Sequence, residues 1–123
     1  MKNHFLTFFI FSLFLGSCSL PSETPIAEFS TSGFRMQLSD RGNLMALIDP
    51  VTGKNHLAQD SLAPLMSLRV KGIFQKPCAA SFKNNTLHLE FEKQRNAQIK
   101  VTQKTSHITF ELIALNQAKE VDL

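Results

Sequence analysis

Residues 86–92 read TLHLEFE, and this stretch indicates the fold class of the chain. Its apolar residues Leu87, Leu89 and Phe91 alternate with polar or charged ones. Successive side chains of a β-strand point to opposite faces of a sheet, so an alternation with a period of two predicts a strand with one buried face. The solvent-facing side of this expected strand consists of His88, Glu90 and Glu92.

The same alternation recurs in other parts of the chain, and polar turn sequences separate the runs. The runs expected to form strands are 34–38, 44–48, 65–70, 87–91, 99–102 and 108–114. The turn sequences between them include Asp40-Arg41-Gly42-Asn43, Thr52-Gly53-Lys54-Asn55, Lys71-Gly72 and Asn84-Asn85. Glycine and asparagine tolerate the positive φ angles of tight turns. Short strands separated by such turns predict an all-β fold, an antiparallel β-sandwich.

Two segments interrupt the alternation. Pro77 lies inside the run 74–82, and proline has no N–H group to donate to a neighbouring strand, so we expect the run to break there. Residues 57–64 are less regular and are expected to form a connecting loop. After the first 17 residues, no helical periodicity extends over more than about two turns.

The first 17 residues have the composition of a signal peptide. Lys2 and His4 form a short basic start, and the run from Phe5 to Leu15 is apolar. A membrane-spanning helix needs about 20 apolar residues, so this run is too short for a permanent span. We expect residues 1–17 to be helical in a membrane and to be removed by cleavage.

Residues 15–18 read LGSC and resemble the lipobox of bacterial lipoproteins. The resemblance implies cleavage between Ser17 and Cys18 and lipidation of the Cys18 thiol, and two or more acyl chains hold a protein on a bilayer. Ser19, in the place of an aspartate, resembles the outer-membrane sorting signal of Gram-negative lipoproteins. The expected location is therefore the cell envelope, lipid-anchored in the outer membrane. The alternative is an ordinary secretory leader that is cleaved elsewhere, in which Cys18 is an incidental residue.

The remaining residues divide into a tether and a domain. Residues 18–25 are polar and contain two prolines, so we expect a flexible tether. Residues 26–123 are expected to form the β-sandwich. Residues 120–123 look like the start of another strand, and a sheet that ends in a cut strand has an unpaired edge. We therefore expect the domain to be truncated at its C-terminus and the chain to be the N-terminal piece of a longer protein.

Four segments occur in an order that identifies a candidate family. They are 36–43 (MQLSDRGN), 47–49 (LID), 52–55 (TGKN) and 65–70 (LMSLRV). Their order over residues 33–123 resembles the start of the galactose-mutarotase-like β-supersandwich that precedes the catalytic barrel of large secreted glycoside hydrolases. The resemblance implies a non-catalytic domain that supports a downstream carbohydrate-active domain, in a full-length parent that is a glycoside hydrolase.

The sequence contains no recognisable catalytic site. A glycosidase needs two carboxylates roughly 5 to 10 Å apart. Glu90 and Glu92 are close on one expected strand face, which we interpret as a solvated face. The chain has no Trp or Tyr to form the aromatic platform on which sugar rings stack. We therefore expect no catalytic residue and no cofactor in this chain.

No metal site is expected either. His4 belongs to the leader, and the remaining histidines do not have metal-ligand spacing on one element. These remaining histidines are His56, His88 and His107. The turn at 40–43 lacks the alternating acidic ligands and the terminal glutamate of a calcium loop. Cys78 has no partner in the chain once Cys18 is lipidated, so we expect it to be a buried, small apolar residue.

The charge distribution argues against a nucleic-acid partner. The formal net charge is +3 at pH 7, and basic residues are interspersed with acidic ones along the sequence. A nucleic-acid binder needs a concentrated stripe of Lys and Arg, so we expect none. The expected partners are a membrane, through the lipid anchor, and a glycan or a downstream catalytic domain. The alternative function is that of a stand-alone envelope lipoprotein that binds a protein or a glycan.

Overall fold

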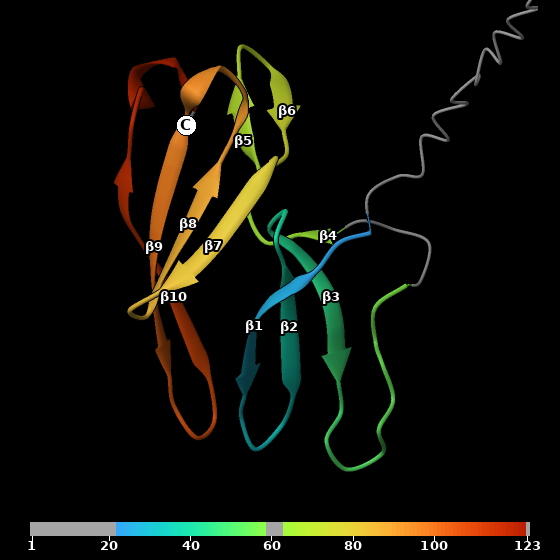
Figure 1. Ribbon diagram of the computed structural model, residues 1–123. Coiled ribbons are helices and arrows are strands. Elements are labelled where there is room, and N and C mark those ends of the chain that lie inside the picture. The colour runs from blue at the N-terminus through green and yellow to red at the C-terminus, as the bar shows by residue number, and fades with distance from the viewer. Residues whose placement is uncertain (1–21, 59–62, 123) are drawn as a thin grey trace, which may run out of the picture.

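The computed structural model describes residues 22–58 and 63–122, which form two four-stranded antiparallel sheets and a two-stranded hairpin (Figure 1). The first sheet has the order β1 (Pro25–Ser30), β2 (Arg35–Ser39), β3 (Asn43–Ile48), β4 (Ala63–Pro64). The second has the order β10 (Ile108–Leu115), β9 (Asn96–Gln103), β8 (Thr86–Glu90), β7 (Ala79–Lys83). The hairpin pairs β5 (Leu68–Val70) with β6 (Ile73–Gln75), and the 3₁₀ helices are η1 (Glu92–Gln94) and η2 (Ala118–Glu120). The expected all-β, sandwich-like architecture is confirmed.

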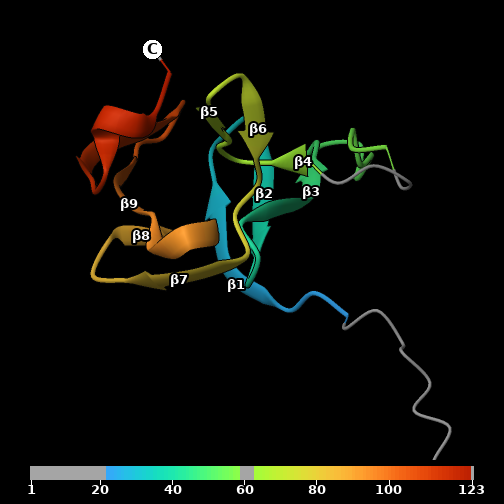
Figure 2. The ribbon, with the colours of Figure 1, turned by 90° about the horizontal axis from the view of Figure 1, so that it is seen from above.

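The two four-stranded sheets form two layers (Figure 2), and their apolar residues pack together into one core. The ring of Phe29 in β1 contacts Phe82 of β7 and Phe110 of β10 edge to face, with centroid distances of 5.2 and 6.0 Å. Aromatic rings prefer this arrangement because the positive edge of one ring meets the negative face of the other. The most deeply buried apolar residues around them are Leu38, Leu87, Leu89 and Ala97. Phe29 therefore joins the first sheet to both outer strands of the second.

The strand at 86–92 has the expected buried face but ends earlier than expected. Its apolar residues are buried, including Phe91 just beyond the strand. The expectation that Glu92 belongs to the solvent-facing side of this strand is wrong, because β8 ends at Glu90 and Glu92 begins η1. The Phe91 N–H donates a hydrogen bond to the Arg95 carbonyl oxygen at 2.8 Å, which closes a tight turn in place of further strand. Glu90 and Glu92 therefore do not share a strand face.

Two hairpin turns expected from the sequence are confirmed. Asn84 and Asn85 connect β7 to β8 with φ angles of 51° and 56°. Lys71 and Gly72 connect β5 to β6 with φ angles of 50° and 79°. Two-residue loops with positive φ at both positions match the twist of the flanking strands. The expected break at Pro77 is also confirmed, since Pro77 falls between β6 and β7.

β1 is not among the strands expected from the sequence, which begin at residue 34. The structure places Pro25 at the start of β1, where a missing N–H group does little harm. A register shift between Pro25 and Ala27 interrupts the pairing with β2. As a result Ile26 and Ala27 are both half-buried, and the alternation that reveals other strands is broken.

The connection between the third strand and the hairpin also differs from expectation. The loop expected over 57–64 ends in the short strand β4, in which Pro64 pairs with Asn43. The strand expected over 65–70 is shorter, because β5 includes only its last three residues. The apolar residues that precede β5 contact the core from an irregular segment.

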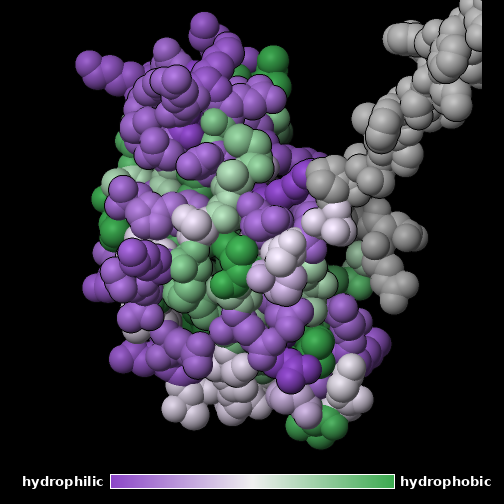
Figure 3. All heavy atoms as spheres, viewed as in Figure 1, coloured by the Kyte–Doolittle hydropathy of each residue, from purple (hydrophilic) through white to green (hydrophobic). Residues whose placement is uncertain are grey.

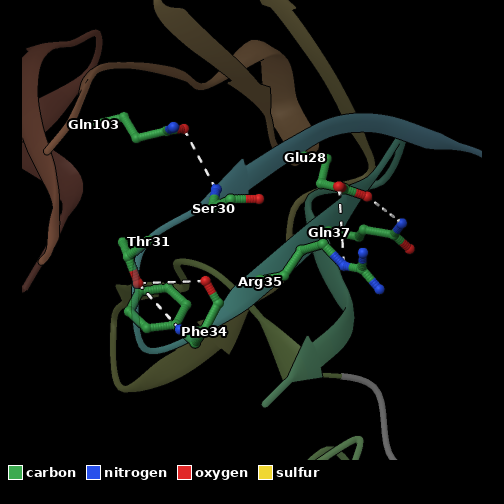
Figure 4. Close-up of polar contacts among 7 residues, drawn as sticks. All are labelled: Glu28, Ser30, Thr31, Phe34, Arg35, Gln37 and Gln103. Carbon is green, nitrogen blue, oxygen red and sulfur yellow. Dashed lines mark hydrogen bonds and ion pairs between the residues drawn. The ribbon is translucent and has the colours of Figure 1, made fainter. Parts of the chain in front are cut away.

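Polar contacts hold the two sheets together near the β1–β2 and β9–β10 turns. The Ser32 N–H donates a hydrogen bond to the Thr105 carbonyl oxygen at 2.7 Å. The Ser30 N–H donates to Oε1 of Gln103 at 3.4 Å (Figure 4). These bonds cross from the first sheet to the second, so this end of the sandwich is closed by the backbone as well as by the core.

At the other end, the C-terminal segment holds the β5–β6 hairpin. Val121 forms an isolated antiparallel bridge with Val70 of β5. The Asp122 N–H donates to the Arg69 carbonyl oxygen at 2.7 Å, and the Asp122 carboxylate accepts from the Gly72 N–H at 2.7 Å. The same carboxylate lies 3.4 Å from Nε of Arg69. The segment after β10 thus fastens both the strand and the turn of the hairpin.

Candidate functional site

The turn between β2 and β3 fixes the position of Arg41. The buried Ser39 hydroxyl accepts hydrogen bonds from the N–H groups of Arg41, at 3.2 Å, and Asn43, at 3.1 Å. Gly42 has a φ of 74° and lies against the Pro77 ring. The chain therefore reverses over a buried hydroxyl, with Arg41 at the outside of the turn.

Three segments that are distant in sequence are bonded to this turn. The Asp40 carbonyl oxygen accepts from the Ala80 N–H of β7 at 2.7 Å. The Asp40 N–H donates to the Thr24 carbonyl oxygen at 2.8 Å, and the Thr24 N–H donates to the Asp40 carboxylate at 3.2 Å. The Gly42 carbonyl oxygen accepts from Leu65 at 2.9 Å. Arg41 is therefore presented by a turn that joins the N-terminal segment to both sheets.

The β8–β9 connection carries Lys93 in an unusual backbone conformation. Lys93 has φ 56° and ψ 37°, and Gln94 has φ 59°, both in the left-handed region. Each L-residue with a side chain loses roughly 1–2 kcal/mol in this conformation. The turn is held by a hydrogen bond from Asn116 Nδ2 to the Gln94 carbonyl oxygen at 2.9 Å and by the ion pair of Arg95 with Glu120.

These turns and the β5–β6 hairpin surround a groove with a volume of about 850 Å³. Four cationic side chains from three segments of the chain line it, together with one carboxylate and an exposed aromatic ring. We call this site the basic groove, and its members are Arg41, Lys71, Phe74, Lys76, Glu92 and Lys93. Hydrophilic side chains cover most of this end of the molecule, and hydrophobic ones appear at its edge on the side of the hairpin (Figure 3).

Within the described residues, the salt bridges that form do not involve the cations of the basic groove. Among residues 22–58 and 63–122, no carboxylate lies within 4.0 Å of the charged nitrogens of Arg41, Lys71, Lys76 or Lys93. Glu92 lines the same groove but forms no ion pair there. Like charges that face one space raise its positive potential and attract anions.

An apolar surface borders the cations. Phe74 and Ile73 of β6 are 71% and 68% exposed. Exposed apolar residues next to a polar groove are typical of interaction sites. The groove thus combines positive charge with an aromatic face.

A second surface lies along β10, the outer strand of its sheet. Leu112 and Ile113 of β10 are 48% and 49% exposed. A groove of about 260 Å³ runs beside Leu112, between β9 and β10 on one side and the segment of Leu65 and Met66 on the other. We call this site the β10 surface, and its members are Leu65, Met66, Ile99, Phe110, Leu112 and Ile113.

Of the residues singled out in the sequence, Cys78 and Glu92 both line the basic groove, and the others do not converge on one site. Ser17 and Cys18 lie outside the described residues. His56 and His107 are exposed, His88 is half-buried in β8, and Glu90 is exposed. Within 22–58 and 63–122, no three His, Cys, Asp or Glu residues are grouped closely enough to hold a metal ion.

The expectation that Cys78 is buried is wrong. Pro77 occupies the buried position against Gly42, and Cys78, the next residue, is exposed. Its N–H and its thiol both approach the Glu90 carbonyl oxygen, at 2.8 and 3.3 Å. Cys78 therefore lies just before β7, where it is exposed and lines the basic groove.

The carboxyl group of Asp49 has a lowered pKa but belongs to neither surface. The Val51 N–H donates to Asp49 Oδ1 at 2.8 Å, and this bond, followed by the Thr52 side chain, lowers the pKa of Asp49 below 3.8. Hydrogen bonds to a carboxylate favour its charged form. Asp49 thus stabilises a turn.

Comparison with known proteins assigns no relatives to this chain: no family model, no curated protein and no solved structure matches it. No helix in the described part of the chain has the length and apolar character needed to cross a membrane. The basic groove was not found by sequence reasoning, because its cations are scattered over more than fifty positions and are brought together by three turns.

Proposed function

We propose that this chain is a lipid-anchored, non-catalytic β-sandwich module of the cell envelope that supports a downstream carbohydrate-active domain. The observation that carries the proposal is the β10 surface. β10 is an outer strand, and exposed apolar residues on such a strand favour contact with another protein surface.

The composition of the β10 surface fits a docking role. The exposed side chain of Leu112 lines the groove together with Leu65, Met66 and Phe110, and the next residue of β10, Ile113, is exposed as well. Burying apolar area stabilises a contact by roughly 25 cal/mol per Å². A domain docked here would remove the exposed apolar area of β10 from water and would extend the core of the sandwich.

The proposed anchor is close to the domain in sequence. Thr24, which is bonded to Asp40, is six positions after Cys18. Six residues extend over about 22 Å at most. A lipid on Cys18 would therefore hold the Asp40 turn within about this distance of the bilayer surface.

Lipid anchoring is tested by labelling cells with a radioactive or clickable fatty acid. The full chain is expected to take up the label and to fractionate with membranes, and Cys18→Ser is expected to lose the label. Cys78→Ser is the matched control, since it removes the other cysteine of the chain. An unlabelled parent protein, or labelling that survives Cys18→Ser, contradicts the anchor.

Support of a downstream domain is tested first by reading the coding DNA beyond codon 123. An in-frame continuation into a carbohydrate-active domain is expected, and an in-frame stop contradicts this part of the proposal. In the longer protein, Leu112→Lys with Ile113→Lys is expected to expose the boundary between the domains to limited proteolysis. Thr109→Lys is the control, because Thr109 is also exposed on β10 but is not apolar.

A second candidate function is favoured by the basic groove. An open groove with cations and an aromatic ring is suited to binding a ligand directly. In this case the chain acts as an envelope lipoprotein that binds a glycan or protein without a downstream domain. The two candidate functions use different surfaces. The first needs the β10 surface for docking of a domain, and the second needs the basic groove for binding of a ligand.

A further inference from the structure

We propose that the basic groove binds an acidic glycan, a carbohydrate chain that carries carboxylate or sulfate groups. This inference deepens the second candidate function, because it rests on ligand binding and names the ligand class and the site. It needs neither the lipid on Cys18 nor docking at β10. Its failure is therefore distinguishable from a failure of anchoring.

Charge complementarity selects an anion. Arg41, Lys71, Lys76 and Lys93 come from three separate segments and line one groove, with Glu92 as the single carboxylate that lines it among the described residues. Holding like charges together costs free energy unless counter-charges are bound. Lys and Arg bind carboxylate and sulfate oxygens through charge-assisted hydrogen bonds. An anionic ligand would supply the counter-charge that the described residues, apart from Glu92, do not.

Shape and aromatic exposure select a carbohydrate among anions. The groove volume of about 850 Å³ is that of an extended ligand and exceeds the space that one inorganic ion requires. Phe74 is 71% exposed beside the cations, and the apolar face of a sugar ring packs against an aromatic ring. Cations then bind the acidic groups while Phe74 contacts the ring.

Two lysines are held in place by the backbone. Lys71 sits in a two-residue turn whose Gly72 N–H is bonded to Asp122. Lys93 has a left-handed φ of 56°. Strained conformations of this kind persist where the surrounding structure enforces them, and they concentrate at binding sites. The backbone that carries these two lysines is therefore fixed, while their side chains are exposed to solvent.

The observations favour a glycan over other polyanions. A bilayer surface is flat or convex to a protein, whereas this site is a groove. Proteins that bind single-stranded nucleic acids stack successive bases on several aromatic rings. Phe74 is the one aromatic ring that lines the groove in the described part of the chain.

The test is affinity electrophoresis of the detergent-solubilised full chain in gels that contain polygalacturonate, chondroitin sulfate or neutral dextran. Both acidic polymers are expected to retard the protein, and dextran is expected not to. Raising the sodium chloride concentration is expected to weaken the retardation, because salt screens exposed charges. Equal retardation by dextran, or no retardation by either acidic polymer, overturns the proposal.

Variants locate the site. Lys76→Gln and Lys93→Gln are each expected to weaken binding about tenfold, as the loss of one charge-assisted hydrogen bond implies. Phe74→Ala is expected to weaken binding to the glycans but not to inorganic polyphosphate, a separation that a purely electrostatic surface would not give. Lys100→Gln is the control, since Lys100 is exposed on β9 outside the groove. Unchanged binding in the groove variants overturns the proposal.

Two further probes separate the glycan from other anions. A single-stranded oligonucleotide is expected to bind more weakly than the acidic polymers. Sedimentation with phosphatidylglycerol vesicles is expected to change little in Lys76→Gln and Lys93→Gln. Tighter binding to the oligonucleotide, or a loss of vesicle binding greater than the loss of glycan binding, assigns the groove to a different ligand and overturns the proposal.

Discussion

Gly42 packs so closely against Leu89 that a Cβ atom on the glycine would lie 2.9 Å from Cδ2 of the leucine. The same Cβ would lie 3.1 Å from Cγ of Pro77. Real Cβ atoms do not approach other carbon atoms this closely. The turn that presents Arg41 is therefore seated directly on the core strand β8 and on the segment before β7.

Gly42→Ala is expected to destabilise the protein by roughly 2–4 kcal/mol, from the left-handed conformation and from the steric overlap with Leu89. Gly53→Ala is the matched control: its φ is 71°, but nothing lies within 4 Å of its Cβ position. It is expected to cost roughly 1–2 kcal/mol, from the conformation alone. Urea denaturation followed by circular dichroism measures both, and equal losses would contradict the role of the overlap.

Removing the partner of a buried cation is expected to weaken the fold. The Arg95 side chain is 3% exposed and pairs with Glu120, which is 53% exposed. Glu120→Gln leaves the buried guanidinium without a counter-charge. We expect a loss of roughly 1–2 kcal/mol, less than for a fully buried pair because water screens Glu120. Glu111→Gln, an exposed change on β10, is the control in thermal unfolding and is expected to shift the midpoint little.

The Asp49 turn is expected to make stability depend on acid pH. Hydrogen bonds from Val51 and Thr52 lower the pKa of Asp49 in the folded protein below 3.8. A lowered folded-state pKa means that the stabilisation is fully present above the unfolded value and disappears as the pH falls through the folded value. The stability difference between the parent protein and Asp49→Asn should therefore be largest above pH 3.8 and should close below it. NMR titration of the Asp49 carboxyl carbon checks the direction of the shift.

The central position of Phe29 predicts a large effect of its truncation. Phe29→Ala removes two edge-to-face contacts and leaves a cavity between the sheets, at an expected cost of roughly 3–5 kcal/mol. Phe74→Ala removes the same side chain from an exposed position and should change stability by less than about 0.5 kcal/mol. If both variants unfolded at the same urea concentration, the assignment of Phe29 to the core would be wrong.

Local patterns predicted the regular strands and their turns, because alternation and positive-φ residues act over a few positions. Leu87 and Leu89 are buried and Asn84-Asn85 forms a turn, as expected. The alternation of the sequence does not reveal β1, because its register shift leaves the neighbouring residues Ile26 and Ala27 both half-buried. Glu92 is expected on a strand face but begins a 3₁₀ turn in which Lys93 is left-handed. Neither glutamate nor lysine is a residue type from which such a turn can be predicted.

Long-range features were not predictable in the same way. Cysteine is a residue type that is often buried, so Cys78 is expected in the interior. The neighbouring Pro77 occupies the buried position next to Gly42 instead, and Cys78 is exposed. The basic groove depends on which turns lie next to each other in the fold. Arg41 and Lys93 line the same groove only because the two sheets pack together. The spacing of these residues in the sequence does not predict that they line one groove.

The fastening of the β5–β6 hairpin by Val121 and Asp122 has a mechanical consequence. A pulling force applied at Asp122 would act on the Gly72 N–H through the Asp122 carboxylate, and on β5 through the backbone contacts of Asp122 with Arg69 and of Val121 with Val70. Tension on the C-terminal segment would thus be transmitted directly to one wall of the groove.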